Sequence, residues 1–97
     1  MTTPELTGSD RRDLRAQGQL IPDQVTIGHQ GITAPLQKEV DGLLTRHQLI
    51  KIRATELDRK VRKALFEQMA EISGSALVST VGRTALLYRP NPDLEKS

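Results

Sequence analysis

The chain lacks cysteine and tryptophan altogether, and its 97 residues include one phenylalanine and one tyrosine. Without cysteine it forms no disulfide and offers no thiolate to a metal ion, which fits a reducing cytoplasm. With so few aromatic rings, it has little means of building a platform on which the bases of a single-stranded nucleic acid could stack. These absences argue against a disulfide-stapled scaffold, a thiolate metal site and an aromatic base-stacking surface.

Long apolar runs are missing as well. No stretch approaches the ~18 consecutive apolar residues of a membrane span. Residues 1–5 carry neither the basic nor the apolar region of a secretory signal. We therefore expect a cytoplasmic protein that does not enter a membrane. With 36% hydrophobic and 27% charged residues, 97 residues form one globular core but not two.

Recognisable catalytic groupings are also scarce. The two histidines, His29 and His47, have no carboxylate cluster or nucleophile elbow beside them. Ser73 and Ser75 flank Gly74, but serines at a helix end are turn residues far more often than nucleophiles. We expect a binding protein that is not an enzyme, with no cofactor, no metal and no small-molecule substrate. A small hydrolase is the minor alternative.

Positive charge is concentrated in the middle of the chain. The formal net charge is +2, yet residues 24–90 carry ten Lys and Arg against six Asp and Glu, and both ends are slightly acidic. A basic middle suits a partner that carries phosphates, and it also suits an ordinary solvated surface. Charge alone leaves these two interpretations open.

Capping residues and hydrophobic periodicity predict three helices and four strands. A capping box at Thr7 and Asp10 begins a short polar helix that runs to about Ala16, with Gly18 as its stop. Thr33 and Pro35 begin a second helix, which ends at Arg46-His47. The remaining elements, in chain order, are strands over 24–27 and 49–54, a helix from 55–58 to 74, and strands over 76–81 and 84–89.

The order of these elements predicts an α/β fold in a single domain. Strand–helix–strand units favour parallel neighbours, whereas the last two strands, joined only by Gly82-Arg83, form an antiparallel type II′ hairpin. We therefore expect a mixed four-stranded sheet with three helices, in the order α-β-α-β-α-β-β. In the third helix we expect a buried stripe and an outer basic surface; the stripe comprises Leu57, Val61, Leu65, Met69 and Ile72, and the surface Arg59, Lys60, Arg62 and Lys63.

The most informative segment is a Gly-x-x-Gly turn between a strand and a helix. It comprises Gly28, His29, Gln30 and Gly31, and Thr33 follows as the expected helix cap. Glycines allow close approach of a bulky anion, and the amides at a helix N-terminus favour negative charge. The same spacing clamps a nucleic-acid backbone in KH modules. Two glycines at this spacing are also common in plain tight turns.

Four basic residues are candidates for contact with phosphates. Lys51 and Arg53 project from one face of their strand, Arg83 lies at the hairpin, and Arg89 ends the last strand. Each of them can equally be an ordinary surface charge. The interpretation as a binding site depends on whether the fold brings them close to the glycine turn.

Several motifs together resemble one family, the CRM domain (chloroplast RNA splicing and ribosome maturation), in its stand-alone bacterial YhbY-like form. The similarity covers roughly residues 6–90, which leaves residues 1–5 and 91–97 as flexible ends. The motifs are Leu6-Thr7 with Leu14-Arg15, the segment Ile27–Thr33, Glu39–Leu44 ahead of His47-Gln48-Leu49-Ile50-Lys51-Ile52, and Val81-Gly82-Arg83-Thr84-Ala85-Leu86-Leu87-Tyr88-Arg89-Pro90.

The resemblance implies a fold similar to the C-terminal domain of the third bacterial initiation factor. It also implies RNA binding without catalysis, on precursors of the large ribosomal subunit. Gly28 and Gly31 match the family's RNA-contacting loop, Lys51 its basic strand position, and Arg83 and Arg89 its basic hairpin positions. Many members carry Lys or Arg inside the loop, where this chain has His29-Gln30, so we expect backbone amides to act as the clamp.

The leading hypothesis is a monomeric RNA-binding factor in ribosome assembly. In it, the glycine turn holds a phosphate while Lys51, Arg53, Arg83 and Arg89 follow the flanking backbone. The alternative is a protein-interaction module whose basic face binds an acidic partner.

Overall fold

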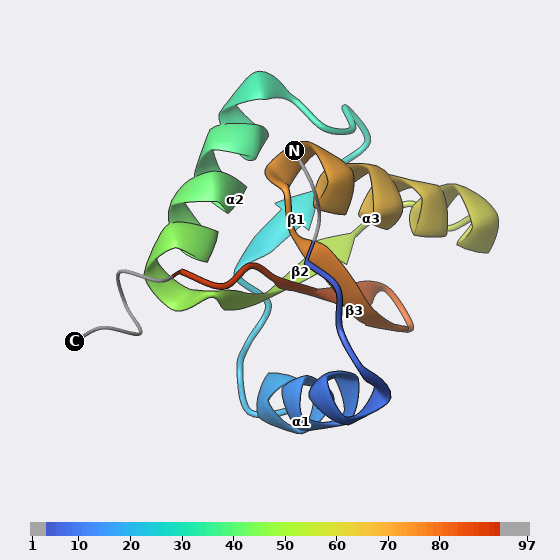
Figure 1. Ribbon diagram of the computed structural model, residues 1–97. Helices are drawn as coiled ribbons and strands as arrows, with labels where there is room; N and C mark the ends of the chain where they lie inside the picture. The colour runs from blue at the N-terminus through green and yellow to red at the C-terminus, as the bar shows by residue number, and fades with distance from the viewer. Residues whose placement is uncertain (1–3, 92–97) are drawn as a thin grey trace.

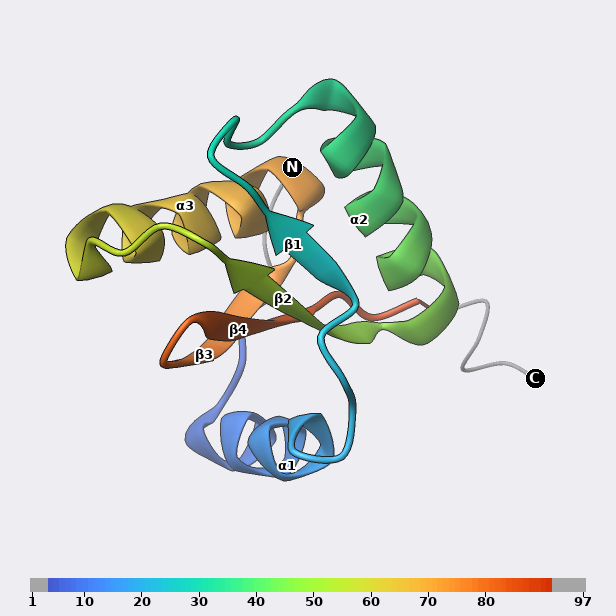
Figure 2. The same ribbon diagram turned by 180° about the vertical axis from the view of Figure 1, so that it is seen from behind.

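The computed structural model describes residues 4–91 and contains the predicted helices and strands in the predicted order (Figures 1 and 2). The α/β class and the sequence α-β-α-β-α-β-β are confirmed. The elements are α1 (Gly8–Gly18), β1 (Val25–Ile27), α2 (Ala34–His47), β2 (Leu49–Ala54), α3 (Arg59–Ser73), β3 (Ala76–Val81) and β4 (Thr84–Tyr88).

The four strands form one mixed sheet in the order β1-β2-β4-β3. β1 and β2 run parallel, with Val25 opposite Ile52 and Ile27 opposite Ala54. β4 pairs antiparallel with both β2 and β3. The strands that flank α3 are therefore not neighbours, because the final strand of the chain inserts between them.

One face of the sheet carries the main core. Ile50, Ile52 and Ala54 alternate with Lys51 and Arg53 and are fully buried, as the period of two predicts. α2 and α3 cover this face, while α1 lies on the opposite one (Figure 1). The cluster comprises Val25, Ile27, Leu36, Val40, Leu44, Ile50, Ile52, Ala54, Phe66, Met69, Ala70, Ala85 and Leu87.

α1 begins as predicted and ends differently. Thr7 and Asp10 form the capping box, each side chain accepting the other residue's backbone N–H at 3.0 Å. The hydrogen bond from the Thr7 backbone lowers the pKa of Asp10. Gly18, predicted as the stop, instead belongs to the helix. A Cβ there would lie 2.3 Å from a methyl carbon of Leu86, so this glycine permits the helix to approach the sheet closely.

The predicted buried stripe of α3 is correct at Met69, which is fully buried, and wrong at Leu57, Val61 and Ile72. Leu57 precedes the helix and is 72% exposed, and Val61 and Ile72 are 47% and 38% exposed. Met69 shares the buried face with Phe66, Ala70 and Ser73, a set with helical spacing. The first turns of α3 extend beyond the edge of the sheet, so the aliphatic residues there have no layer to pack against (Figure 1).

The ends of the chain lie largely outside the described residues. Of the segments predicted to be flexible, residues 1–3 and 92–97 are not described. Asn91 is held in place, because its backbone N–H donates to Gln48 Oε1 at 2.9 Å and its side-chain amide to the Thr45 carbonyl at 2.7 Å. Among the helices of the described chain, none is long and apolar enough to cross a membrane.

Candidate nucleic-acid interface

The glycine motif forms a tight turn directly after β1. The Gly31 N–H donates to the Gly28 carbonyl at 2.9 Å, and His29 and Gln30 occupy the exposed tip. Gly31 has a φ of 76°, a left-handed conformation that L side chains rarely adopt. The backbone of the turn therefore favours glycine at position 31.

Gly28 is different, because nothing in the fold requires a glycine there. Its φ is not positive, and a Cβ at this position would meet no atom within 4 Å. Its surface is exposed. A glycine in open space leaves the backbone accessible to a ligand from outside the chain.

The start of α2 contributes fewer free donors than the sequence predicts. Thr33 is the predicted cap and accepts the Leu36 N–H at 3.3 Å, while Gln37 donates to the Thr33 carbonyl. Pro35 has no N–H. Ala34 is therefore the one first-turn amide of α2 without a partner in the described structure.

Three loops lie together at the carboxyl end of β1 and β2: the glycine turn, the segment after β2 and the β3–β4 hairpin. The Ala54 N–H donates to the Arg83 carbonyl at 2.9 Å, which joins the hairpin to the end of β2. The Thr55 N–H donates to the Ile27 carbonyl at 3.0 Å, which joins the segment after β2 to the base of the glycine turn. Figure 2 shows the turn after β1, the start of α3 and the β3–β4 hairpin on the same side of the molecule.

The Gly82-Arg83 loop places Arg83 at the exposed tip of the hairpin. Gly82 has a φ of 57° and Arg83 does not have a positive φ, as the predicted type II′ loop requires. The Thr84 hydroxyl closes the loop by donating to the Val81 carbonyl at 2.9 Å. Arg83 thus extends from a short, hydrogen-bonded turn beside the end of β2.

The basic residues at the start of α3 lie next to this hairpin. Asp58 caps the helix, accepting the N–H groups of Lys60 and Val61 at 2.9 and 3.0 Å. A surface hollow of about 460 Å³ is shared by the helix and the hairpin; it is lined by Arg59, Arg62, Lys63, Phe66, Thr80 and Gly82. These cations are evident in the sequence, but only the topology shows that they border the hairpin.

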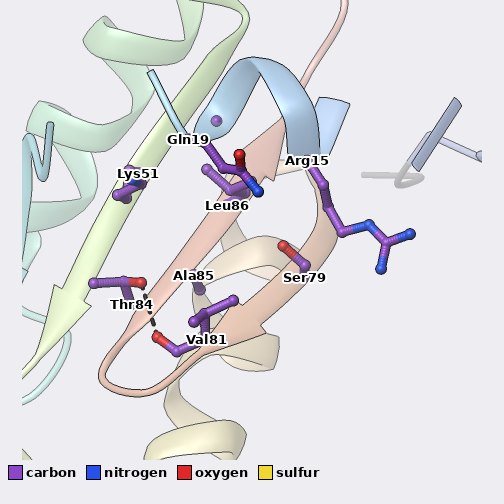
Figure 3. Close-up of a pocket in the computed structure, with 9 residues that line it drawn as sticks. Arg15, Gln19, Lys51, Ser79, Val81, Thr84, Ala85 and Leu86 are labelled. Atoms are coloured by element: carbon purple, nitrogen blue, oxygen red, sulfur yellow. Dashed lines mark hydrogen bonds between the residues drawn. The ribbon is translucent and has the colours of Figure 1, made fainter. Parts of the chain in front are cut away.

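Lys51 and Arg53 lie on the face of the sheet that α1 partly covers. Arg53 is exposed, pairs with Thr26 and Thr84 of the adjacent strands, and lies 3.7 Å from the Asp23 carboxylate. Lys51, two residues further from the glycine turn, is half-buried at one side of a hollow of about 210 Å³ beneath α1 (Figure 3). Arg15 stands across that hollow and extends toward solvent.

Arg89 occupies the opposite end of the sheet and is bound within the fold. Its Nη1 donates to Asp41 Oδ1 at 2.7 Å and to the Ser73 carbonyl at 2.8 Å. Its Nη2 donates to the Asp41 carbonyl and to Thr45 Oγ1, both at 3.0 Å. The side chain is 19% exposed. The structure thus separates Arg89 from the other candidate residues and gives it a role in fastening β4 to both α2 and α3.

The two serines considered for catalysis are hydrogen-bonded to each other inside the fold. Ser73 and Ser75 are buried, and their hydroxyl oxygens are 2.8 Å apart in a mutual hydrogen bond. Within residues 4–91, no group of three or more His, Asp or Glu side chains is placed to hold a metal ion.

Comparison with known proteins identifies close similarity in both sequence and structure. Residues 6–89 match the family model described as the CRS1 / YhbY (CRM) domain. A probable RNA-binding protein of Pseudomonas aeruginosa is 29% identical over 95% of this chain and 88% of its own length. An RNA-binding protein of Haemophilus influenzae is 27% identical over 96% of this chain and 92% of its own.

The solved structures contain the same fold. The solution structure of a hypothetical Staphylococcus aureus protein, described as a candidate RNA-binding protein, superposes with a TM-score of 0.80 at 31% identity. The superposition covers 90% of this chain and 91% of the other.

Proposed function

The chain belongs to the CRS1 / YhbY (CRM) domain family, and on that premise we propose that residues 6–90 form a non-catalytic RNA-binding domain. The observation that carries this proposal is the convergence of cations from separate elements around an open glycine turn. We call this surface the basic end; it comprises the turn Gly28–Gly31 together with Arg53, Arg59, Lys60, Lys63 and Arg83.

In this proposal the turn binds a phosphate through backbone amides. The His29 and Gln30 amides lie at an exposed tip, and the missing side chain of Gly28 lets the RNA backbone approach. The side chains of His29 and Gln30 donate further hydrogen bonds to phosphate oxygens.

Arg83 and Arg53 hold the flanking phosphates, and Lys51 extends the path over the sheet. The contact between Arg53 and Asp23 leaves this path open, because both side chains are substantially exposed and such surface pairs are weak. Arg89 is not part of the proposed surface, since its donors are bound inside the fold.

Salt dependence tests whether the basic end, at Arg83, and the adjoining Lys51 contact phosphates. Removing one phosphate-binding cation reduces the slope of log K against log salt by ~0.7 for a single strand. We expect that reduction in Arg83→Gln and in Lys51→Gln, with similar losses of affinity on unrelated RNA sequences, because phosphate contacts carry no base information. Fluorescence anisotropy of a labelled RNA over a series of KCl concentrations measures the slope.

Arg46→Gln is the matched control for this measurement. Arg46 is an exposed arginine in the last turn of α2, away from the basic end, so its loss is expected to leave the slope unchanged. A full slope in both Arg83→Gln and Lys51→Gln would place these residues outside the interface. Such a result, with weak RNA affinity, would favour an acidic protein partner for the basic face.

We further propose that the RNA is precursor rRNA of the large ribosomal subunit and that the chain acts in the cytoplasm as a monomeric assembly factor. The family resemblance supports the choice of subunit. The fold supports recognition by RNA shape, because the one Phe is 1% exposed and the one Tyr is half-buried. Folded rRNA offers both shape and dense phosphate.

In a cell lysate separated on a sucrose gradient at low magnesium, the protein is expected to migrate with large-subunit particles. Immature particles should carry more of it than finished ribosomes, because a factor held by a few charged contacts leaves as the RNA matures. Immunoblotting of the fractions measures this distribution. Protein that stays at the top of the gradient in mild salt, or follows the small subunit, would contradict the assembly role.

A further inference from the structure

An aliphatic groove lies beside the glycine turn. It has a volume of about 420 Å³ and lies between the 28–31 turn and the segment Thr55–Leu57. Val61 and Leu65 of α3 complete its lining. Leu57 and Val61 are two of the residues that were predicted to be buried, and the fold leaves them 72% and 47% exposed.

Single exposed aliphatic residues are common and need no explanation, but here two exposed ones, Leu57 and Val61, gather with the half-buried Leu65 in one concave site. The backbone that presents Leu57 is held by hydrogen bonds. Arg62 Nη1 donates to the Glu56 and Leu57 carbonyls at 2.9 and 3.3 Å, and the Asp58 N–H donates to Glu56 Oε1 at 3.0 Å. Leu57 is therefore exposed on an ordered segment rather than on a loose loop.

The two walls of the groove are joined to each other. The Thr55 N–H donates to the Ile27 carbonyl at 3.0 Å, directly beneath the glycine turn. The spacing between the turn and the 55–57 segment is thus set before any ligand arrives. A preformed site loses less conformational freedom on binding than one that must be ordered.

We propose that this groove receives an unpaired nucleobase of an RNA whose backbone crosses the glycine turn. The inference rests on the proposed RNA binding and adds to it a base contact and a preference for unpaired RNA. A base has apolar faces that suit Leu57 and Val61, and a polar edge within reach of groups such as the Thr55 hydroxyl and the His29 imidazole.

The charge around the groove favours RNA over an apolar peptide or a second copy of the chain. The groove shares Gly28 and Gly31 with the proposed phosphate contact, and the exposed cations Arg59 and Lys60 stand at the start of the helix that lines it. A base in the groove therefore places its own phosphate on the basic end. Glu56 adds a single negative charge on the wall opposite the turn, where it can accept a hydrogen bond from a base amino group.

This geometry predicts which RNA is bound. A base inside a duplex is paired and stacked, so only a loop, bulge, junction or single strand presents one that can enter the groove. The contact is aliphatic, so it does not depend on the aromatic stacking that many single-strand binders use.

The test compares a short single-stranded RNA with the same strand carrying abasic nucleotides, which keep every phosphate. We expect the unaltered protein to bind the intact strand about fivefold to tenfold more tightly, the effect of burying one base face against two aliphatic side chains. The double variant Leu57→Ala with Val61→Ala should lose that preference and keep the affinity for the abasic strand. Both side chains are exposed, so thermal unfolding is expected to change little.

Leu20→Ala is the matched control, since Leu20 is 86% exposed and follows α1 on the other side of the sheet. It should retain the preference for the intact strand. Equal affinity of the unaltered protein for intact and abasic strands, with salt-dependent binding to both, would overturn the base site and leave RNA binding standing.

Absence of binding to either strand would overturn the base site, whereas RNA binding itself is decided separately by the salt series and the gradient described above. Sedimentation of the same proteins tests whether a second copy of the chain occupies the groove instead. A self-association of the unaltered protein that the double variant abolishes, without any change in RNA affinity, would make the groove a contact between copies and overturn the inference.

Discussion

Gly28→Asp is expected to weaken RNA binding about tenfold or more while the fold stays intact. The fold tolerates the change because Gly28 has an ordinary φ and a Cβ there meets no atom within 4 Å. The new carboxylate stands where a phosphate is proposed to bind. Two like charges about 4 Å apart repel by ~1 kcal/mol in water and ~4 kcal/mol near a protein surface, and ~1.4 kcal/mol is a tenfold change in affinity.

Binding isotherms and circular dichroism on the same preparation measure both parts of this prediction. Gly28→Asn is the matched control, because it adds a side chain of the same shape without the charge. A larger loss in the aspartate variant than in the asparagine variant identifies electrostatic repulsion, whereas equal losses identify steric exclusion of the RNA backbone. Full RNA affinity in a folded Gly28→Asp variant would exclude the turn from the interface.

Gly31 is a poorer site for the same experiment. Its φ of 76° is unfavourable for an L side chain, so a substitution there strains the turn itself. A loss of RNA affinity in a Gly31 variant would then mix a backbone effect with a ligand effect. The sequence treats the two glycines alike, and the structure distinguishes them by conformation.

Local signals in the sequence were sufficient to predict the elements of the fold. Thr7 and Thr33 cap their helices as predicted, and β2 alternates as its sequence indicates, because each depends on residues a few positions apart. The hairpin follows from the two residues that join its strands. The insertion of β4 between β2 and β3, by contrast, depends on pairing between distant parts of the chain.

Errors arose where tertiary contacts decided the outcome. Leu57 and Val61 fit a helical stripe by spacing, but α3 extends past the sheet at that end and leaves them exposed. Glycine is a common residue at helix ends, but Gly18 lies within α1 and allows the helix to pack closely against Leu86. In both cases the deciding partner lies far away in the sequence.

In the candidate site, too, the residues can be predicted from the sequence but their arrangement depends on long-range contacts. The sequence identifies the glycine turn and the basic residues, but the proximity of Arg83, the turn and the start of α3 results from β4 pairing with β2. Arg83 and Arg89 look equivalent as the basic residues at the two ends of one strand. The fold exposes the first and binds the second, since only Arg89 faces the ends of α2 and α3.

Arg89→Gln is therefore expected to destabilise the fold and to leave the RNA affinity of the folded protein unchanged. The guanidinium is 19% exposed and donates to two carbonyls, a hydroxyl and a carboxylate. Hydrogen bonds that involve a charged group contribute ~1.5–3 kcal/mol, whereas the ion pair itself adds little because Asp41 is 62% exposed. We expect a loss of about 2 kcal/mol, or roughly 10 °C in Tm for a domain of this size.

Arg83→Gln is the comparison variant for this prediction. Arg83 is exposed at the hairpin tip, and within the described residues its side chain makes no hydrogen bond that would stabilise the fold. The variant should weaken RNA binding and keep the Tm, the reverse of Arg89→Gln. Urea unfolding gives the free energies, and RNA titrations well below both midpoints give the affinities of the folded proteins. An Arg89→Gln protein with an unchanged Tm and weakened RNA binding would show that this guanidinium leaves Asp41 and Ser73 for a phosphate. The basic surface would then have to extend to the far end of the sheet.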